Sequence, residues 1–103
     1  MQTAPQIVFE NMDSSDALRE RIEKEIEKLE QFHDRITACR VAVRAPGQHK
    51  RNGGLFEVRI YLVLPGGGEI AVGRNPQQDH AHEDVYIALR DAFAAARRHL
   101  QNM

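Results

Sequence analysis

The sequence predicts an α+β fold with the element order β-α-β-β-β-α, in a single domain that spans residues 1–103. Four short segments alternate apolar with polar residues, which is typical of half-buried strands, and two long segments repeat apolar residues every three or four positions, which is typical of amphipathic helices. Because each strand has one apolar face, the simplest packing is a four-stranded, mostly antiparallel sheet with both helices on its apolar side. With 42% hydrophobic and 28% charged residues, the chain has ordinary globular composition.

The first half of the chain begins with a strand at Gln6 to Met12, where Ile7 and Phe9 alternate with their neighbours. A helix is expected from about Ser15 to Phe32, and the segment Asp13-Ser14-Ser15-Asp16 supplies side chains that cap its start. Spacings of three and four residues give this helix one apolar stripe, the clearest pattern in the sequence. The members of the stripe are Leu18, Ile22, Ile26, Leu29 and Phe32.

The second half contains three more strands, expected at Thr37 to Arg44, Leu55 to Leu64 and Glu69 to Arg74. Pro65-Gly66-Gly67-Gly68 joins the last two as a hairpin turn. A second helix is expected from about Glu83 to Gln101, with cations in its last turns where they suit the helix dipole. The residues expected to face the core are Cys39, Val41, Val43, Phe56, Val58, Ile60, Leu62, Ile70 and Val72 in the strands and Val85, Leu89, Ala92, Phe93, Ala96 and Leu100 in the helix.

The composition argues against a membrane or secreted protein. The longest apolar run, Ile60 to Leu64, is far shorter than the about 20 residues that a membrane helix needs. The first residues have no basic stretch followed by an apolar one, so we expect no signal peptide. A single cysteine cannot form an internal disulfide, and a cytoplasmic location is therefore expected. The net charge of −1 gives no general argument for nucleic-acid binding.

No motif in the sequence predicts catalysis or a cofactor. Cys39 lies on the apolar face of its strand, where a buried thiol behaves as a small hydrophobic group and not as a nucleophile. The glycines Gly66 to Gly68 lie between two strands and do not open a helix, so they predict a turn and not a phosphate-binding loop.

One segment offers candidate metal ligands. His80 and His82 project to one side of an extended chain and are flanked by Asp79, Glu83 and Asp84. The alternative is an acidic helix start, in which Glu83 and Asp84 complement the helix dipole. No zinc-ligand spacing is present, so we expect no metal, and an enzyme or metal protein built on this segment is the least favoured function.

Two sets of helix motifs together resemble one protein family. The first helix contains Asp16-Ala17-Leu18-Arg19-Glu20 and Lys28-Leu29-Glu30-Gln31-Phe32. The last helix contains His82-Glu83-Asp84-Val85-Tyr86 and Arg98-His99-Leu100. In this order and spacing they are similar to the helices of the ribosome hibernation promoting factor and ribosome-associated inhibitor A family, also called the sigma-54 modulation protein family. The resemblance covers nearly the whole chain.

The resemblance implies a fold like that of double-stranded-RNA-binding domains and a binding function without catalysis, cofactor or small-molecule substrate. Family members bind the small ribosomal subunit in the channel used by messenger and transfer RNA, and they silence translation during stress. The resemblance therefore implies a hibernation factor whose partner is ribosomal RNA, with no membrane association. Since the sequence ends at Met103, it implies the short form, which lacks the dimerising C-terminal domain.

The resemblance also implies a site, on the basic residues of both helices. Arg19, Lys28 and Arg98 match basic positions of the family, and Tyr86 matches its tyrosine. Two helices that pack side by side expose their outer surfaces together, so their cations can merge into one field. The expected RNA-binding residues are Arg19, Lys28, Arg90, Arg97 and Arg98.

A second function stays open, a protein-interaction module of the same fold that has lost affinity for ribosomal RNA. A lysine that is usual in the family's last helix is Ala95 here, and the family's lysine-rich tail is missing. The first helix also carries more acidic than basic residues, which dilutes any positive field.

The polar face of the sheet is a second candidate RNA surface. Arg40, Arg44, Arg59 and Tyr61 would share it, and cations beside an aromatic ring are typical of surfaces that bind single strands. An ordinary polar sheet face, with Glu57 as a cross-strand partner, is the favoured interpretation. Three further cations lie in the neighbouring loops, namely Lys50, Arg51 and Arg74.

Overall fold

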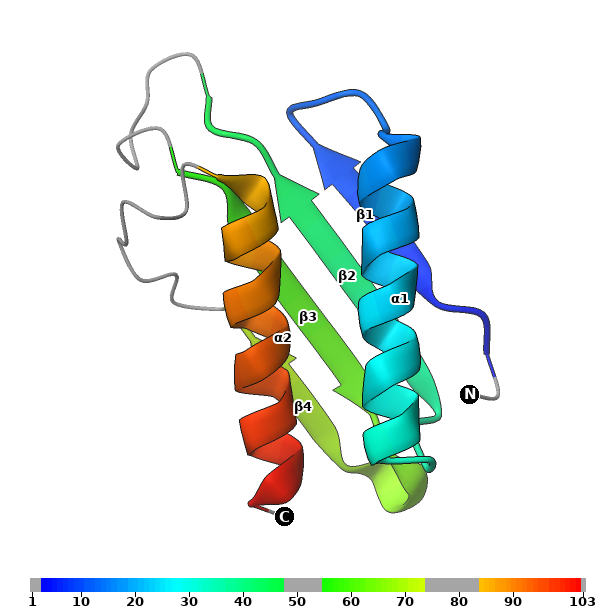
Figure 1. Ribbon diagram of the computed structural model, residues 1–103. Coiled ribbons are helices and arrows are strands. Elements are labelled where there is room, and N and C mark those ends of the chain that lie inside the picture. Colours follow the sequence, from blue (N-terminus) through cyan, green and yellow to red (C-terminus); the bar gives the residue numbers. More distant parts are fainter. Residues whose placement is uncertain (1–2, 48–54, 74–83, 103) are drawn as a thin grey trace.

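The computed structural model describes residues 3–47, 55–73 and 84–102. Its elements follow the predicted β-α-β-β-β-α order, so the α+β class is confirmed (Figure 1). A single turn of 3-10 helix, η1, lies in the predicted hairpin turn. The elements are β1 (Gln6–Glu10), α1 (Asp16–Phe32), β2 (Ala38–Arg44), β3 (Glu57–Val63), η1 (Pro65–Gly67), β4 (Glu69–Val72) and α2 (Val85–Gln101).

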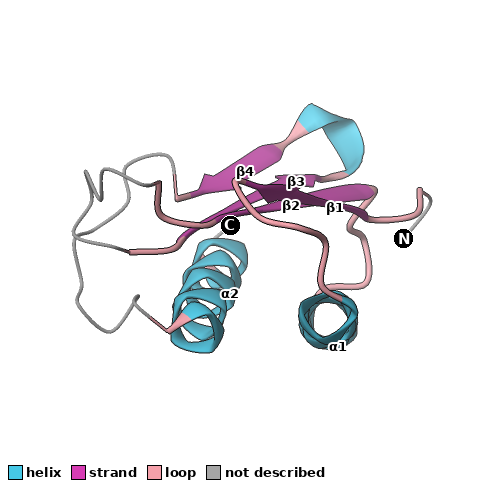
Figure 2. Ribbon diagram, turned by 90° about the horizontal axis from the view of Figure 1, so that it is seen from above, coloured by secondary structure: helices cyan, strands magenta, loops and turns pink. Residues whose placement is uncertain are grey.

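The four strands form one sheet in the order β1-β2-β3-β4. β1 and β2 are parallel because α1 connects them as a crossover, whereas β2 with β3 and β3 with β4 are antiparallel. Both helices lie side by side on the same face of the sheet (Figure 2). The mostly antiparallel sheet with two helices on one face is thus confirmed, whereas the likeness to double-stranded-RNA-binding domains stays a prediction.

Helix α1 begins where the sequence places a capping residue. The Ser15 side chain accepts a hydrogen bond from the Leu18 backbone N–H at 3.3 Å, which satisfies one of the free donors at the helix start. The stripe is buried as predicted at Leu18, Ile22, Ile26 and Leu29. Its last member departs from the prediction, because Phe32 is 46% exposed. Phe32 is the final residue of α1 and is rotated by about 60° from Leu29 around the axis, on the flank of the stripe and not at its centre.

The core lies between the helices and one sheet face. The alternation predicted for the strands is confirmed at eight of the nine strand residues expected to face the core, since Cys39, Val41, Val43, Val58, Ile60, Leu62, Ile70 and Val72 are all buried. Phe56 and Val85 are only partly buried, because both lie at the start of an element, at the edge of the core. Phe56 immediately precedes β3, and Val85 is the first residue of α2. Neither helix of the described ranges has a stretch long and apolar enough to cross a bilayer.

Helix α2 starts two residues later than the sequence analysis placed it. The Asp84 side chain accepts a hydrogen bond from the Tyr86 backbone N–H at 2.9 Å and caps the helix. Packing of the apolar stripe then turns Leu89, Phe93 and Ala96 toward the sheet. Every arginine of α2 therefore lies on the exposed side of the helix.

Candidate nucleic-acid interface

Helix α1 separates its charges onto two flanks. Arg21, Lys24 and Lys28 are three and four residues apart, so they share one flank of a helix that turns by about 100° per residue. The guanidinium carbon of Arg21 lies 5.9 Å from the ring centroid of Tyr86 in α2, which shows that this basic flank faces α2. The same spacing puts four acidic residues on the opposite flank, namely Asp16, Glu23, Glu27 and Glu30, whereas Glu20 lies beside Lys24, four residues before it.

Helix α2 presents cations on the flank that faces α1. Tyr86, Arg90 and Arg97 are four and seven residues apart, which places them on one side of the helix. Because Tyr86 contacts Arg21, that side is turned toward α1. The two helices therefore share an interhelical strip, which we define as Arg21, Lys24, Lys28, Tyr86, Arg90 and Arg97.

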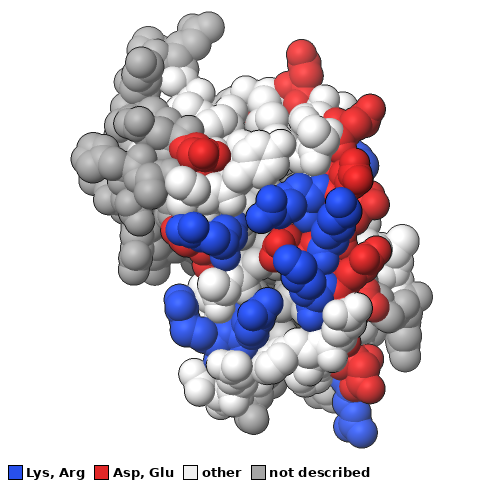
Figure 3. Space-filling view, viewed as in Figure 1, with Lys and Arg blue, Asp and Glu red and all other residues white. Residues whose placement is uncertain are grey.

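The space-filling view shows this separation directly. Lysine and arginine side chains gather along the side of α1 that faces α2 and on α2 itself, while acidic side chains line the outer side of α1 (Figure 3). A chain with a net charge of −1 thus carries a local positive surface. Such a surface attracts phosphate groups even though the whole molecule does not.

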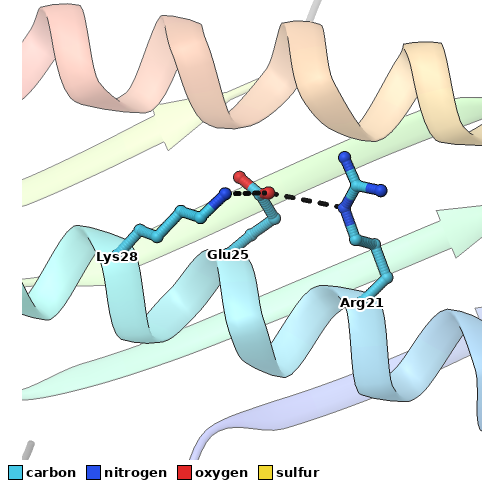
Figure 4. A network of polar contacts seen from close by, with 3 residues as sticks. All are labelled: Arg21, Glu25 and Lys28. Atoms are coloured by element: carbon cyan, nitrogen blue, oxygen red, sulfur yellow. Dashed lines mark hydrogen bonds and ion pairs between the residues drawn. The ribbon is translucent and has the colours of Figure 1, made fainter.

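One acidic residue lies inside the strip. Glu25 is 8% exposed, and its Oε1 atom lies 3.4 Å from Nε of Arg21 and 3.3 Å from Nζ of Lys28 (Figure 4). The side chains of Arg21 and Lys28 remain 42% and 59% exposed, so both cations keep contact with solvent. Two cations around one carboxylate leave this part of the strip positive.

Two other cations of the strip, Lys24 and Arg90, have weak, exposed partners. Lys24 Nζ lies 3.5 Å from Oε1 of Glu20, and Arg90 lies 3.3 Å from Oδ1 of its neighbour Asp91. The side chains of Lys24 and Arg90 are 65% and 67% exposed. Exposed pairs of this kind contribute at most about 1 kcal/mol, so a phosphate group can replace the carboxylate.

The structure brings three of the five predicted residues together and separates two. Lys28, Arg90 and Arg97 lie in the interhelical strip. Arg19 lies on the other flank of α1, where its guanidinium carbon is 5.7 Å from the ring centroid of Phe9 in β1. Arg98 lines a depression beside β4 with Glu69, Ile70, His99 and Asn102.

Two cations of the strip, Arg21 and Lys24, were missed by the sequence analysis. Their spacing relative to Lys28 is the signal that identifies them, because residues separated by three, four and seven positions share a helix face. A charge count over the whole helix hides this local excess of cations, because the acids of the opposite flank enter the same sum.

The polar sheet face carries the second predicted set. Arg40 and Tyr61 are cross-strand partners, and Arg44 lies opposite Glu57, the partner proposed from the sequence. Arg59 forms an ion pair with Glu10 of β1. A hydrogen bond from the hydroxyl of Tyr61 to Glu69 raises the pKa of this tyrosine, with smaller contributions from burial and from the Glu69 charge. Lys50, Arg51 and Arg74 lie outside the described residues.

The polar sheet face is therefore an electrostatically balanced surface. Acidic residues lie opposite or beside two of its arginines, Arg44 and Arg59, which agrees with the ordinary polar face that the sequence favoured. The interhelical strip has five cations against three acidic partners, Glu20, Glu25 and Asp91, and is the stronger candidate for binding phosphate.

Cys39 is buried under α1 and has no feature of a nucleophile. Burial, with a smaller contribution from the negative charge of Glu30, raises the pKa of its thiol from 9.0 to about 12. The thiolate, which is the reactive form, is therefore scarce in the folded protein at neutral pH.

We expect native Cys39 to react with iodoacetamide at mildly alkaline pH at least about 100-fold more slowly than the denatured chain, since a pKa raised by three units leaves roughly 1,000-fold less thiolate. The raised pKa also means that unfolding releases a proton between pH 9 and about 12, so the free energy of unfolding falls as pH rises through that window. Mass spectrometry of timed samples measures the rate. Equal rates in the native and denatured chain would show that the thiol is accessible.

The candidate metal segment lies almost entirely outside the described residues. His80, His82, Asp79 and Glu83 lie outside the described residues, and Asp84 caps α2. Within residues 3–47, 55–73 and 84–102, no three histidine, cysteine or acidic side chains lie close enough together to hold a metal ion.

Comparison with known proteins identifies the family. The family described as sigma 54 modulation protein / S30EA ribosomal protein matches residues 6–103. The chain belongs to this family. The family resemblance predicted from the two sets of helix motifs is therefore confirmed. No curated protein sequence matches the chain.

Two solved structures resemble this member of the S30EA family. A ribosomal subunit interface protein from Coxiella burnetii has a TM-score of 0.74 at 20% identity, over 95% of this chain and 93% of the other. The N-terminal domain of Protein Y from Thermus thermophilus has a TM-score of 0.67 at 19% identity, over 99% of this chain and 98% of the other. At these identities the two likenesses show a shared fold.

The matched residues of this S30EA family member include both helices in full. The interhelical strip is therefore part of the family domain and not of an extension to it.

Proposed function

We propose that this chain is a ribosome-associated hibernation factor that binds the small ribosomal subunit through ribosomal RNA. The observation that carries the proposal is the interhelical strip, an exposed row of cations from two helices on a protein whose net charge is −1. Family membership supports it, as does the description of one structural relative as a ribosomal subunit interface protein. Ribosomes would place the activity in the cytoplasm.

The chemistry of the strip suits a folded RNA. Lysine and arginine neutralise phosphates and release counterions, which supplies most of the sequence-independent affinity for nucleic acid. Tyr86, which is 42% exposed between these cations, adds an aromatic face on which an unpaired base can stack. Such binding would block translation by occupying the subunit, without a reaction, a cofactor or a small-molecule substrate.

One observation favours the alternative of a protein-interaction module. The four acids on the outer flank of α1 form a surface that repels RNA, and Arg19 lies beside them. A partner with a basic surface would fit that flank. The two functions differ in their partner, so binding to purified ribosomal subunits distinguishes them.

We expect the protein to co-sediment with purified bacterial small ribosomal subunits at low salt and to dissociate as salt rises. If three to five strip cations neutralise phosphates, the logarithm of the association constant should fall with the logarithm of salt concentration with a slope of about −2 to −4. Sedimentation at a series of potassium chloride concentrations measures this slope, and purified large subunits provide the control for general affinity toward ribosomal RNA. Absence of co-sedimentation even at the lowest salt would contradict the ribosomal function and favour the interaction module.

A further inference from the structure

Glu25 stands apart from the other acids of α1. It is the buried charged side chain of the described residues, whereas the remaining acids of α1 are exposed or only partly buried. Burying a carboxylate costs free energy that its partners must offset, and an apolar residue at such a site often gives equal or greater stability. Stability of the fold therefore gives no reason for a glutamate at this position.

The contacts of Glu25 restrain two cations of the strip at once. A single oxygen, Oε1, contacts Nε of Arg21 one turn before it and accepts a hydrogen bond from Nζ of Lys28 one turn after it. The Arg21 side chain is held from a second side, since its guanidinium lies over the Tyr86 ring. The Glu25 carboxylate contacts Nε of Arg21, so the two terminal nitrogens of Arg21 have no acidic partner among the described residues. They point toward α2 (Figure 4).

We propose that Glu25 is a positioning residue of the interhelical strip, which holds Arg21 and Lys28 in the geometry that binds a phosphate group. This inference rests on the proposed function. Long basic side chains lose rotamer freedom when they bind, and a side chain that is already restrained loses less. The carboxylate thus lowers the local positive charge and still raises the affinity for RNA phosphate.

Removal of the Glu25 charge should change the affinity for RNA in the direction opposite to that expected from charge alone. Replacing an acid with a neutral residue raises the positive field and should strengthen RNA binding wherever the acid only dilutes that field. For Glu25 we expect the reverse, because the loss of side-chain order outweighs the gain in charge.

The test compares Glu25→Gln with Glu23→Gln, which makes the same charge change on the opposite flank of the same helix. Both proteins are titrated with purified bacterial small subunits at fixed salt. We expect Glu25→Gln to bind at least about threefold more weakly than the parent, and Glu23→Gln to bind as well as the parent or slightly better. If Glu25→Gln binds as tightly as Glu23→Gln, while the parent binds as proposed, Glu25 is only a diluting charge and the inference is wrong. If the parent itself does not bind, both the proposed function and this inference fail.

Two further measurements keep the test independent of folding and of the ribosome. Arg21→Lys keeps the charge but has a single ammonium group, which cannot contact Glu25 and a phosphate through separate nitrogens; it should lose at least about threefold in affinity, and unchanged affinity contradicts the proposal. In the free protein, the Nε–Hε signal of Arg21 in a heteronuclear NMR experiment should show an ordered side chain in the parent and a mobile one in Glu25→Gln. Equal mobility in the two proteins would also overturn the inference.

Discussion

A variant in which Lys28 and Arg90 are both reversed to glutamate is expected to bind small ribosomal subunits at least about 100-fold more weakly than the parent. Each cation contributes a charged hydrogen bond to phosphate of about 1.5–3 kcal/mol, and each new carboxylate adds repulsion. The two residues lie on different helices of the interhelical strip, so the variant interrupts the field on both sides. Sedimentation or fluorescence titration with purified subunits measures the loss, and the salt slope should fall by about two.

The matched control is Arg35→Glu with Arg44→Glu, which changes the net charge equally at exposed positions away from the strip. This control should retain most of the affinity, because the binding depends on local and not on total charge. Lys28→Glu removes a partner of the buried Glu25 and Arg44→Glu places a carboxylate opposite Glu57, so both variants should melt at a lower temperature than the parent. Binding is therefore compared at a temperature at which circular dichroism shows both variants to be folded. A strip variant that binds as well as the control would move the RNA surface away from the helices.

Truncating Ile26 to alanine is expected to lower the free energy of unfolding by about 2–5 kcal/mol. Ile26 is 2% exposed and lies in the core between α1 and the sheet, so the substitution removes buried apolar contacts and leaves a cavity. A loss of this size is a large fraction of the stability of a small domain. Urea denaturation followed by circular dichroism gives the free energy directly.

Phe32→Ala in the same helix is the control for Ile26→Ala. Phe32 is 46% exposed, so Phe32→Ala should lower the free energy of unfolding by about 1 kcal/mol or less, although it removes more atoms than Ile26→Ala. A cost at Phe32 equal to that at Ile26 would show that the end of α1 packs against the core, as the sequence pattern alone predicted.

The sequence determined most of the fold through local patterns. Period-two alternation placed every strand and its buried face, and spacings of three and four residues placed both helices, because these periods are the geometry of the elements themselves. Deviations occur at the ends, as at Phe32 and at the start of α2, where the position of an element against its neighbours decides burial and a capping side chain decides the first turn.

The candidate site was only partly predictable for the same reason. Lys28, Arg90 and Arg97 were predicted, and they meet in the interhelical strip, whereas Arg19 and Arg98 lie elsewhere. Both helices pack their apolar stripes onto one sheet, and this packing turns the basic flank of α1 toward α2. A count of charges along the sequence cannot predict that rotation.

By itself, the sequence determined the element order, the buried faces and the family, because local periodicity and short motifs are properties of neighbouring residues. Only the tertiary structure decided which cations act together. It turned the basic flank of α1 toward α2 and the acidic flank away, and it enclosed Glu25 between Arg21 and Lys28. The physical reason is that electrostatic fields depend on distances in space, and these are set by the packing of α1 and α2 on the sheet and not by separation along the chain.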